Sequence, residues 1–381
     1  MLNIRFEAQD NRYLRVITFP DGTTSQDIVS FHRTWHDPEP YRWIRPLYEL
    51  ERPEFVEEGK AIAAALLGTS GISFLGSASS AEPLPIVIQE NGQLPEVARI
   101  PWELAFADGR FLATDPCTPI LRRPAHIRLV NRLTLHSPLR MALISASPKD
   151  QQPLMVEEEL FTIALSLDDP IASRRLVVDE IMNCTREKLK EALRGNRYDI
   201  VYFTGHGAFH DNAGFLCLEK PDGETDLMSA DDFSSALRSQ KGLSLLFLNC
   251  CNAASVGAAR SESWEGFGDV ARKAMKQGPP EVVATQSAIF DSTGRRVMKS
   301  FFEELCRGEG FNVAAALALA RGEVEDDRSQ FHDFYQFVHL SLLNKGAVLE
   351  IQTTVTDETD RSGWQDNVVF HTPNRMEIGR N

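Results

Sequence analysis

The sequence predicts an α/β protein with a mostly parallel central sheet and helices on both of its faces. From residue 140 onward, short apolar runs alternate with segments of helical pattern, which is the order that parallel βαβ units require. Two of these runs, 200–203 and 243–248, are almost continuously apolar, as strands buried on both faces are. Each run stops at reactive residues flanked by small or turn-forming ones. Because ligands bind where the strands of such sheets end, these two run ends form the candidate site.

The pattern of the first 130 residues predicts a smaller, β-rich region. Residues 2–19 alternate apolar and polar residues around Asp10-Asn11, which indicates a hairpin. A helix is expected from Pro53, a residue favoured in the first helical turn, to Leu67. The Gly-, Ser- and Ala-rich segment 68–82 is expected to be a loop. Further strands are expected at 84–89, on both sides of the turn Asp108-Gly109, and at 120–129.

The regular β/α part follows. Ser229-Ala-Asp-Asp232 has the pattern of a capping box, which predicts that a helix begins there. The expected strands are 141–147, 176–181, 200–203, 243–248 and 282–285, with a small β excursion at 215–223 and two last strands, 337–343 and 348–352, completing the sheet. The expected helices are 156–167, 185–193, 229–237, 264–275, 292–305 and 313–321.

These elements suggest three regions. Residues 1–130 are expected to form an accessory subdomain, 131–352 the catalytic domain, and 353–381 a linker and the possible start of a further module.

Composition narrows the classes of function. Lys and Arg number 40 and Asp and Glu 54, so the net charge is −14, which disfavours direct nucleic-acid binding. We find no apolar run near the ~20 residues that span a bilayer and no signal-peptide core, so we expect a cytoplasmic protein without a membrane partner. The six cysteines have no CxxC spacing, which argues against a disulfide framework and fits reduced thiols.

The candidate site combines a thiol with an imidazole. His206 stands between Gly205 and Gly207, and Cys251 follows the run 243–248. Glycine on both sides lets the backbone turn sharply and leaves the imidazole open to a substrate. A thiol paired with a histidine can ionise, attack a peptide carbonyl and form an acyl-enzyme, after which the histidine protonates the leaving amine. The backbone N–H groups of Gly207 and Cys251 are the expected oxyanion donors.

The same residues allow three other interpretations. His206 can be a turn histidine, with Cys250 and Cys251 as small buried apolar residues. A metal site of His206, His210, Cys250 and Cys251 is disfavoured, because adjacent cysteines suit tetrahedral coordination poorly and the histidines lie in a loop. Gly205-His-Gly207 lacks the third glycine of a dinucleotide fingerprint. We therefore expect neither a metal nor a cofactor.

Four motifs in order give the chain a family resemblance. They are Pro101-Trp-Glu-Leu104 followed by Asp108-Gly-Arg-Phe-Leu112; Thr204-Gly-His-Gly207; Leu248-Asn-Cys-Cys-Asn-Ala253; and Val283-Ala-Thr-Gln286 with Asp291, Phe301-Phe302, Leu305, Gly308, Ala315-Ala-Leu317 and Ala320-Arg321. Over residues ~84–321 the chain resembles the CHAT domains, bacterial caspase-like peptidases related to separase and the caspases.

The resemblance implies a caspase-like α/β fold with His206 and Cys251 as the catalytic dyad. Cys250 stands where the family usually has alanine, so the alignment assigns the nucleophile to Cys251. The resemblance also implies an endopeptidase that cuts a few protein targets, a role in bacterial defence or programmed cell death, and control by a partner or a fused sensor module. A catalytically silent scaffold is the alternative, and the intact dyad argues against it.

The same resemblance suggests where the primary specificity pocket lies. Its walls are expected from strand ends near the dyad, with Asp211, Gln286 and Asp291 as candidate residues. Asp211 and Asp291 would favour a basic substrate side chain, but Asp291 fits equally well as a helix N-cap. The cleavage preference is therefore open.

Overall fold

A computed structural model gives the fold. It describes residues 1–32, 35, 52–77, 83–125, 127–130, 132–210, 213–250, 270–286, 291–307, 311–326, 340–346 and 348–352.

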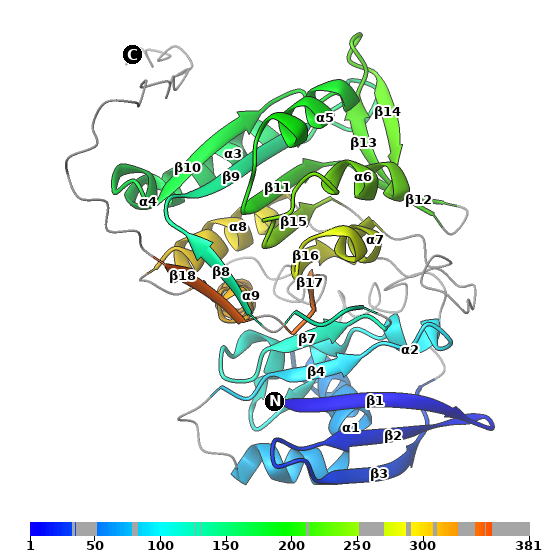
Figure 1. Ribbon diagram of the computed structural model, residues 1–381. Coiled ribbons are helices and arrows are strands. Elements are labelled where there is room, and N and C mark those ends of the chain that lie inside the picture. Colours follow the sequence, from blue (N-terminus) through cyan, green and yellow to red (C-terminus); the bar gives the residue numbers. More distant parts are fainter. Residues whose placement is uncertain are drawn as a thin grey trace, which may run out of the picture.

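A mostly parallel sheet of eleven described strands runs through the molecule (Figure 1). Its order is β10 (Leu176–Ile181), β9 (Leu139–Ala146), β11 (Ile200–Gly205), β15 (Leu245–Asn249), β16 (Glu281–Thr285), β17 (Leu340–Asn344), β7 (Ile120–Arg123), β4 (Ile86–Gln89), β1 (Leu2–Gln9), β2 (Arg12–Thr18) and β3 (Thr24–Val29). Within it, β17 runs antiparallel to β16, β2 to β1 and β3 to β2, and the other neighbours are parallel. The predicted fold class is confirmed.

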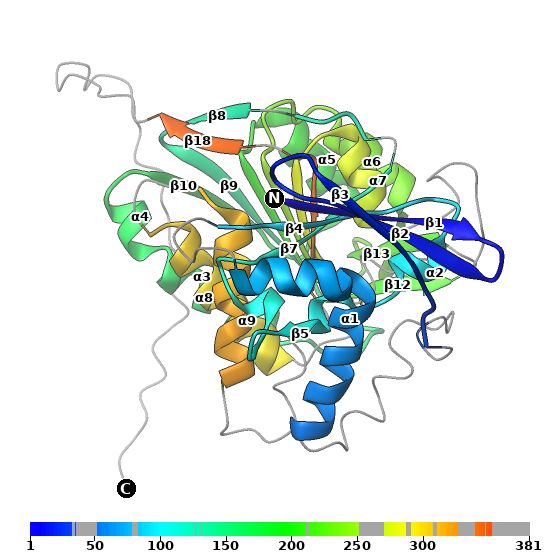
Figure 2. The same ribbon diagram turned by 90° about the horizontal axis from the view of Figure 1, so that it is seen from below.

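Alternate side chains of the central strands enter two separate cores. Ile200 and Tyr202 of β11 join one apolar cluster, whereas Val201 and Phe203 join the other, as the period of two in a strand requires. Figure 2 shows the helices that cover each face. α1 (Arg52–Ser77), α3 (Val156–Ser166), α8 (Asp291–Leu305) and α9 (Val313–Asp326) pack on the first cluster, and α5 (Arg186–Gly195), α6 (Ala230–Leu237) and α7 (Val270–Gln277) pack on the second.

Helix starts follow local hydrogen-bonding rules. The Thr185 hydroxyl accepts a hydrogen bond from the backbone N–H of Lys188, and the Ser229 hydroxyl accepts one from Asp232. Both are N-caps that satisfy a donor left open at a helix start. The capping prediction at Ser229 is confirmed. Short helical segments at α2 (Pro95–Ala98), η3 (Trp102–Leu104), η4 (Leu112–Thr114) and α4 (Asp168–Ala172) complete the described helical part.

Three small sheets flank the central one. The first contains β12 (Gly207–His210), β13 (Ala213–Glu219) and β14 (Thr225–Ser229), and the second is the turn pair β5 (Phe106–Ala107) and β6 (Arg110–Phe111). The third pairs β18 (Val348–Gln352) with β8 (Arg132–His136). The expectation that 348–352 completes the central sheet is therefore wrong, because the backbone of this strand is paired with β8.

The segment after Leu67 is helical, which corrects the loop expected from residue 68. Gly68 breaks the helical geometry at φ 59° and ψ −173°, and α1 then continues to Ser77. The positive φ of Gly68 is a conformation that favours glycine, and the guanidinium of Arg15 lies where a Cβ would stand. Beyond the break, Leu75 is buried in the core and Phe74 packs against Phe19. These tertiary contacts override the loop-like composition.

Of the described helices, α1 alone is long and apolar enough to span a membrane by length and composition. Its buried residues include Phe55, Ile62 and Leu66, which pack in the core of the sheet.

One sheet joins the predicted N-terminal and catalytic regions. β7 lies beside β17, where Arg122 pairs with Leu343, so the strands of residues 1–130 extend the catalytic sheet. Residues 353–381 lie outside the described part of the chain.

Candidate active site

The two predicted run ends lie at the same edge of the sheet. Thr204 near the end of β11 pairs with Ser145 of β9 on one side and with Asn249 of β15 on the other. Leu248 of β15 pairs in turn with Ala284 of β16. The four strands are parallel, so their carboxyl ends face the same edge, where α/β sheets bind ligands (Figure 1).

His206 follows β11 directly and is half-buried. Its Nε2 lies 2.7 Å from the backbone carbonyl oxygen of Gln152. A carbonyl only accepts hydrogen bonds, so Nε2 carries the proton in this contact. The neutral imidazole then has its lone pair on Nδ1, which is the nitrogen able to take a proton from a thiol. Gln152 lies between β9 and α3, a position that sequence patterns do not relate to His206.

Gly205 is required for a reason other than the expected turn. A Cβ at this position would lie 2.7 Å from the carbonyl oxygen of Ala146 on the neighbouring strand. The backbones of β11 and β9 therefore approach too closely for any side chain.

We expect Gly205→Ala to lower the free energy of unfolding by about 1 to 3 kcal/mol, the usual cost of overpacking. Gly195→Ala is the matched control, because a Cβ there meets nothing within 4 Å. Urea unfolding of both variants would measure the difference, and equal midpoints would contradict the close approach.

Cys250 is part of an apolar core. Its side chain is 3% exposed and belongs to the apolar cluster beneath α5, α6 and α7. The His206 imidazole contacts the backbone of the segment that leads into α3. The backbone carbonyl of Cys250 accepts a hydrogen bond from the Thr285 hydroxyl. Cys251 and Asp211 lie outside the described residues.

A buried carboxylate that no sequence motif indicates lies beneath the strand ends. Glu159 of α3 accepts hydrogen bonds from the Tyr202 hydroxyl and, at 3.0 Å, from the Asn249 side-chain amide. Burial and the neighbouring negative charge of Glu159 raise the pKa of Tyr202 well above its usual value. Tyr202 therefore stays a neutral donor. Asn249 precedes Cys250, so Glu159 fixes the end of β15.

Gln286 is part of a buried network. Its side chain is 3% exposed, and its amide donates to the hydroxyl of Ser341 and, at 3.3 Å, to Glu103. The structure thus places its amide group inside the protein. Asp291 is the first residue of α8, and its side chain lies outside the described part.

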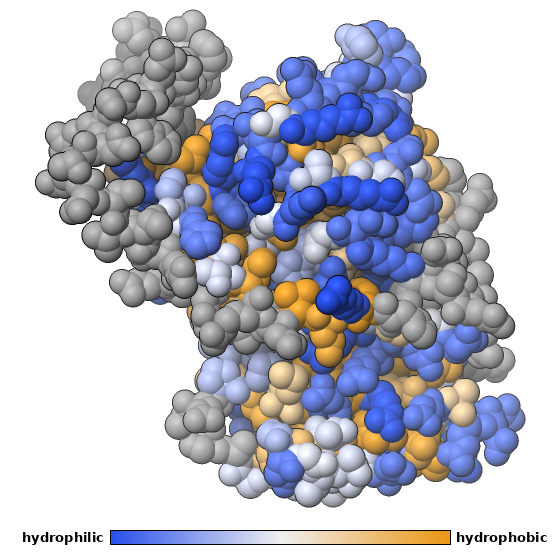
Figure 3. All heavy atoms as spheres, viewed as in Figure 1, coloured by the Kyte–Doolittle hydropathy of each residue, from blue (hydrophilic) through white to orange (hydrophobic). Residues whose placement is uncertain are grey.

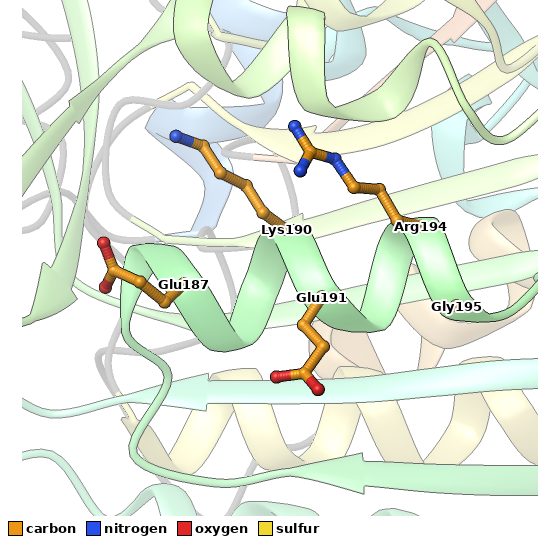
Figure 4. Close-up of a pocket in the computed structure, with 5 residues that line it drawn as sticks. All are labelled: Glu187, Lys190, Glu191, Arg194 and Gly195. Atoms are coloured by element: carbon orange, nitrogen blue, oxygen red, sulfur yellow. The ribbon is translucent and has the colours of Figure 1, made fainter.

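A shallow hollow of the surface lies elsewhere, on α5. It is lined by Glu187, Lys190, Glu191, Arg194 and Gly195, and Figure 4 shows their charged side chains projecting from the helix. Figure 3 shows a mainly hydrophilic surface over α5 and α6. The hollow contains none of the predicted site residues. Among the described residues no group of three or more His, Cys, Asp or Glu side chains could hold a metal ion.

The family model of the CHAT domain matches residues 57–343. The chain belongs to the CHAT domain family. The resemblance seen in the sequence is thereby confirmed, and it extends further toward the N-terminus than the four motifs. Comparison with curated proteins gives no significant match.

Several solved structures of proteases are similar to this CHAT domain. One described simply as a protease has a TM-score of 0.50 at 10% identity, covering 78% of this chain and 75% of the other. The Arg-specific cysteine proteinase gingipain R has a TM-score of 0.47 at 11% identity, covering 80% and 76%. Saccharomyces cerevisiae separase, in complex with securin, has a TM-score of 0.48 at 11% identity, covering 92% of this chain but 30% of separase.

Proposed function

We propose that this CHAT domain is a cysteine endopeptidase with Cys251 as nucleophile and His206 as general base and acid. The observation that carries the proposal is the hydrogen bond between His206 Nε2 and the Gln152 carbonyl. It holds the imidazole at the carboxyl edge of the sheet in the tautomer whose Nδ1 can accept a proton.

The strand register supports Cys251 rather than Cys250. Thr204 pairs with Asn249, and residues 206 and 251 each come two positions later in the sequence. β11 ends at Gly205 and β15 at Asn249, and we propose that the alternation of the strands continues to residues 206 and 251, so that both side chains share a face. The thiol of Cys250 is instead packed beneath α5 to α7.

The reaction follows from these roles. His206 Nδ1 takes the thiol proton, the sulfur attacks the carbonyl carbon of the substrate, and a C–S bond forms. The C–N bond then breaks as the imidazolium gives its proton to the leaving amine. Water, deprotonated by His206, hydrolyses the acyl-enzyme and regenerates the thiol.

The N–H of Gly207 suits the oxyanion role. Cys217 N–H donates to the carbonyl of His206 at 3.0 Å, which makes these two residues a hydrogen-bonded pair of the β12–β13 ladder. The next pair, Gly207 and Leu216, is then the non-hydrogen-bonded kind, so the Gly207 N–H points away from β13. We propose it as an oxyanion donor together with the N–H of Cys251.

The biological setting belongs to the same proposal. We propose that the enzyme acts in the cytoplasm on a few protein targets, in bacterial defence or cell death, with a partner or sensor module controlling it. Asp211, Gln286 and Asp291 are proposed to shape the specificity pocket, Gln286 from within the buried network. A catalytically silent scaffold is the competing function.

The test compares wild type with Cys251→Ala, Cys250→Ala and His206→Ala, each incubated with proteins encoded beside it and analysed by mass. We expect Cys251→Ala to abolish cleavage, His206→Ala to slow it by about 10²- to 10⁴-fold, and Cys250→Ala to preserve it. Loss of cleavage with Cys250→Ala alone would move the nucleophile by one residue. No cleavage by wild type together with its partners would favour the scaffold.

Thiol labelling gives a test that needs no substrate. Burial raises the pKa of Cys184 to about 12 and that of Cys306 to about 11, so both react slowly with iodoacetamide near neutral pH. An activated Cys251 should label well before them, and His206→Ala should remove its advantage. Equal labelling of Cys251 in wild type and His206→Ala would contradict the dyad.

A further inference from the structure

The contact between His206 and the Gln152 carbonyl depends on a segment without regular secondary structure. Residues 147–155 connect β9 to α3 and form neither helix nor strand. A backbone carbonyl in such a segment can orient an imidazole only if other contacts fix the segment.

Five hydrogen bonds fix this segment, and all of them reach the hairpin of β13 and β14. The N–H of Ser147 donates to Glu219 Oε1 at 2.9 Å, and the N–H of Lys149 donates to the Gly223 carbonyl at 2.9 Å. Two more use the Thr225 hydroxyl, which donates to Asp150 Oδ1 at 2.7 Å and accepts from Gln151 Nε2 at 3.0 Å. In the fifth, the Thr225 N–H donates to Asp150 Oδ1 at 2.9 Å.

The same hairpin holds the histidine. β12, which begins directly after His206, pairs with β13, and Cys217 of β13 donates its N–H to the His206 carbonyl. Figure 1 shows β12, β13 and β14 together at one end of the molecule, beside α6. The hairpin therefore holds the backbone of His206 through Cys217. Through Thr225 it holds Asp150 and Gln151, the two residues that precede the orienting carbonyl of Gln152.

We propose that Thr225 and Asp150 are positioning residues that set the tautomer and orientation of His206 through the Gln152 carbonyl. The inference rests on the proposed function only where reactivity of Cys251 is concerned. Thr225 has the central role, because its single hydroxyl forms hydrogen bonds with two consecutive residues, Asp150 and Gln151, which immediately precede Gln152. Without it, the carbonyl can move away from Nε2, and Nδ1 then competes for the proton.

The test uses isosteric replacement. Thr225→Val removes both hydroxyl contacts but keeps the branched strand side chain and the N–H bond to Asp150. Thr225→Ser restores the hydroxyl. Asp222→Asn is the control in the same turn, because the described bond of the Asp222 side chain joins it to Glu224 within the turn. Asp150→Ala, at an exposed position, is a second variant that will fold if Thr225→Val does not.

The decisive readout is the ring-nitrogen NMR spectrum of ¹⁵N-histidine-labelled protein, with the His206 signals identified by their loss in His206→Gln. Wild type, Thr225→Ser and Asp222→Asn should show the Nε2-protonated tautomer, and Thr225→Val and Asp150→Ala a mixture of both. An unchanged tautomer in folded Thr225→Val and Asp150→Ala would overturn the proposal, whatever the activity.

A second readout separates this proposal from the proposed function. Labelling of Cys251 by iodoacetamide should slow by about tenfold in Thr225→Val and recover in Thr225→Ser, because small misplacements of catalytic groups cost one to two orders of magnitude in rate. A tautomer change without slower labelling would support the positioning role and count against His206 as the base of Cys251.

Discussion

Replacing Glu103 with alanine is expected to lower the free energy of unfolding by about 3 to 5 kcal/mol, the cost of breaking a buried ion pair from one side. The carboxylate of Glu103 accepts hydrogen bonds from Arg122 Nε at 2.9 Å and Nη2 at 2.6 Å, and both residues have 0% exposure. In the variant the guanidinium of Arg122 stays buried and keeps Glu90 at the longer distance of 3.7 Å. A buried charge that loses its closest partner is the source of the large cost.

Because of its position, replacing Glu103 is expected to destabilise the whole sheet rather than one local segment. Glu103 lies in the N-terminal motif, yet its Oε1 accepts a hydrogen bond at 2.8 Å from Ser341 of β17, and its Oε2 accepts one from Gln286 after β16. The carboxylate therefore joins both sides of the sheet where β7 meets β17. We expect the loss to appear in the whole unfolding transition rather than in a local one.

Urea unfolding followed by tryptophan fluorescence would measure the loss. Glu57→Ala is the control: its exposed i,i+3 pair with Lys60, at 2.6 Å, should contribute within about 1 kcal/mol. A Glu103→Ala midpoint close to that of Glu57→Ala would contradict the proposed contribution of the buried network to the free energy of unfolding.

The pH dependence of this contribution has a definite sign. Burial raises the pKa of Glu103, but the charge and hydrogen bonds of Arg122, helped by Arg321, outweigh it, and the net pKa lies below the usual range. The stabilisation is therefore present above the unfolded-state pKa and is lost as the pH falls through the folded-state pKa. Acidification should destabilise wild type more than Glu103→Ala.

The sequence predicted the site's place in the fold better than its supporting contacts. Strand ends and motif order depend on local apolar runs, and these brought residues 206 and 250 to one edge of the sheet. The hydrogen bonds of Gln152 and Glu159 join segments 54 and 90 residues apart, and no local pattern encodes such contacts. The chemistry of the side chains does not separate Cys250 from Cys251 in the sequence, and the structure adds that Cys250 is buried beneath α5 to α7.

Tertiary pairing also explains the fold predictions that failed. The composition predicts a loop from Gly68, but this residue is a break within α1 beside the Arg15 side chain, and Leu75 beyond it packs in the core. Residues 348–352 have the composition of a strand, and composition alone did not indicate β8 as the partner. In both cases the competing partners lie far away in the sequence, so propensity could not choose between them.

Glu281→Gln is expected to stabilise the protein strongly at alkaline pH. Glu281, at the start of β16, is 5% exposed, and its Oε1 accepts a hydrogen bond from Asn344 at 2.8 Å, while Oε2 has no hydrogen-bond partner among the described residues. Burial raises the pKa of this carboxyl to about 8, and Asn344 opposes the shift. The folded protein thus holds Glu281 protonated in a range where the unfolded chain ionises it.

The sign follows from proton binding. Because the folded-state pKa is raised, the protonated form is favoured fully below the unfolded-state pKa, and this contribution is lost as the pH rises through about 8. Glutamine keeps the acceptor for Asn344 but cannot ionise. Between pH 5 and pH 9 the stability of Glu281→Gln should therefore gain about 4 kcal/mol relative to wild type, at about 1.4 kcal/mol per pH unit over most of this range.

Urea unfolding of both proteins at pH 5, 7 and 9 would measure this gain. Glu303→Gln, on the exposed surface of α8, is the control and should follow wild type at every pH. A constant difference between Glu281→Gln and wild type would mean that Glu281 is ionised in the folded protein throughout, with its charge balanced by a neighbour. Lys345 is one candidate for that role, since it follows Asn344 and donates its Nζ to the Gly278 carbonyl at 3.2 Å. Burial lowers the pKa of Lys345 to about 8. A lysine that is partly neutral would balance little of the charge of an ionised Glu281. We therefore expect the stability difference between Glu281→Gln and wild type to depend steeply on pH.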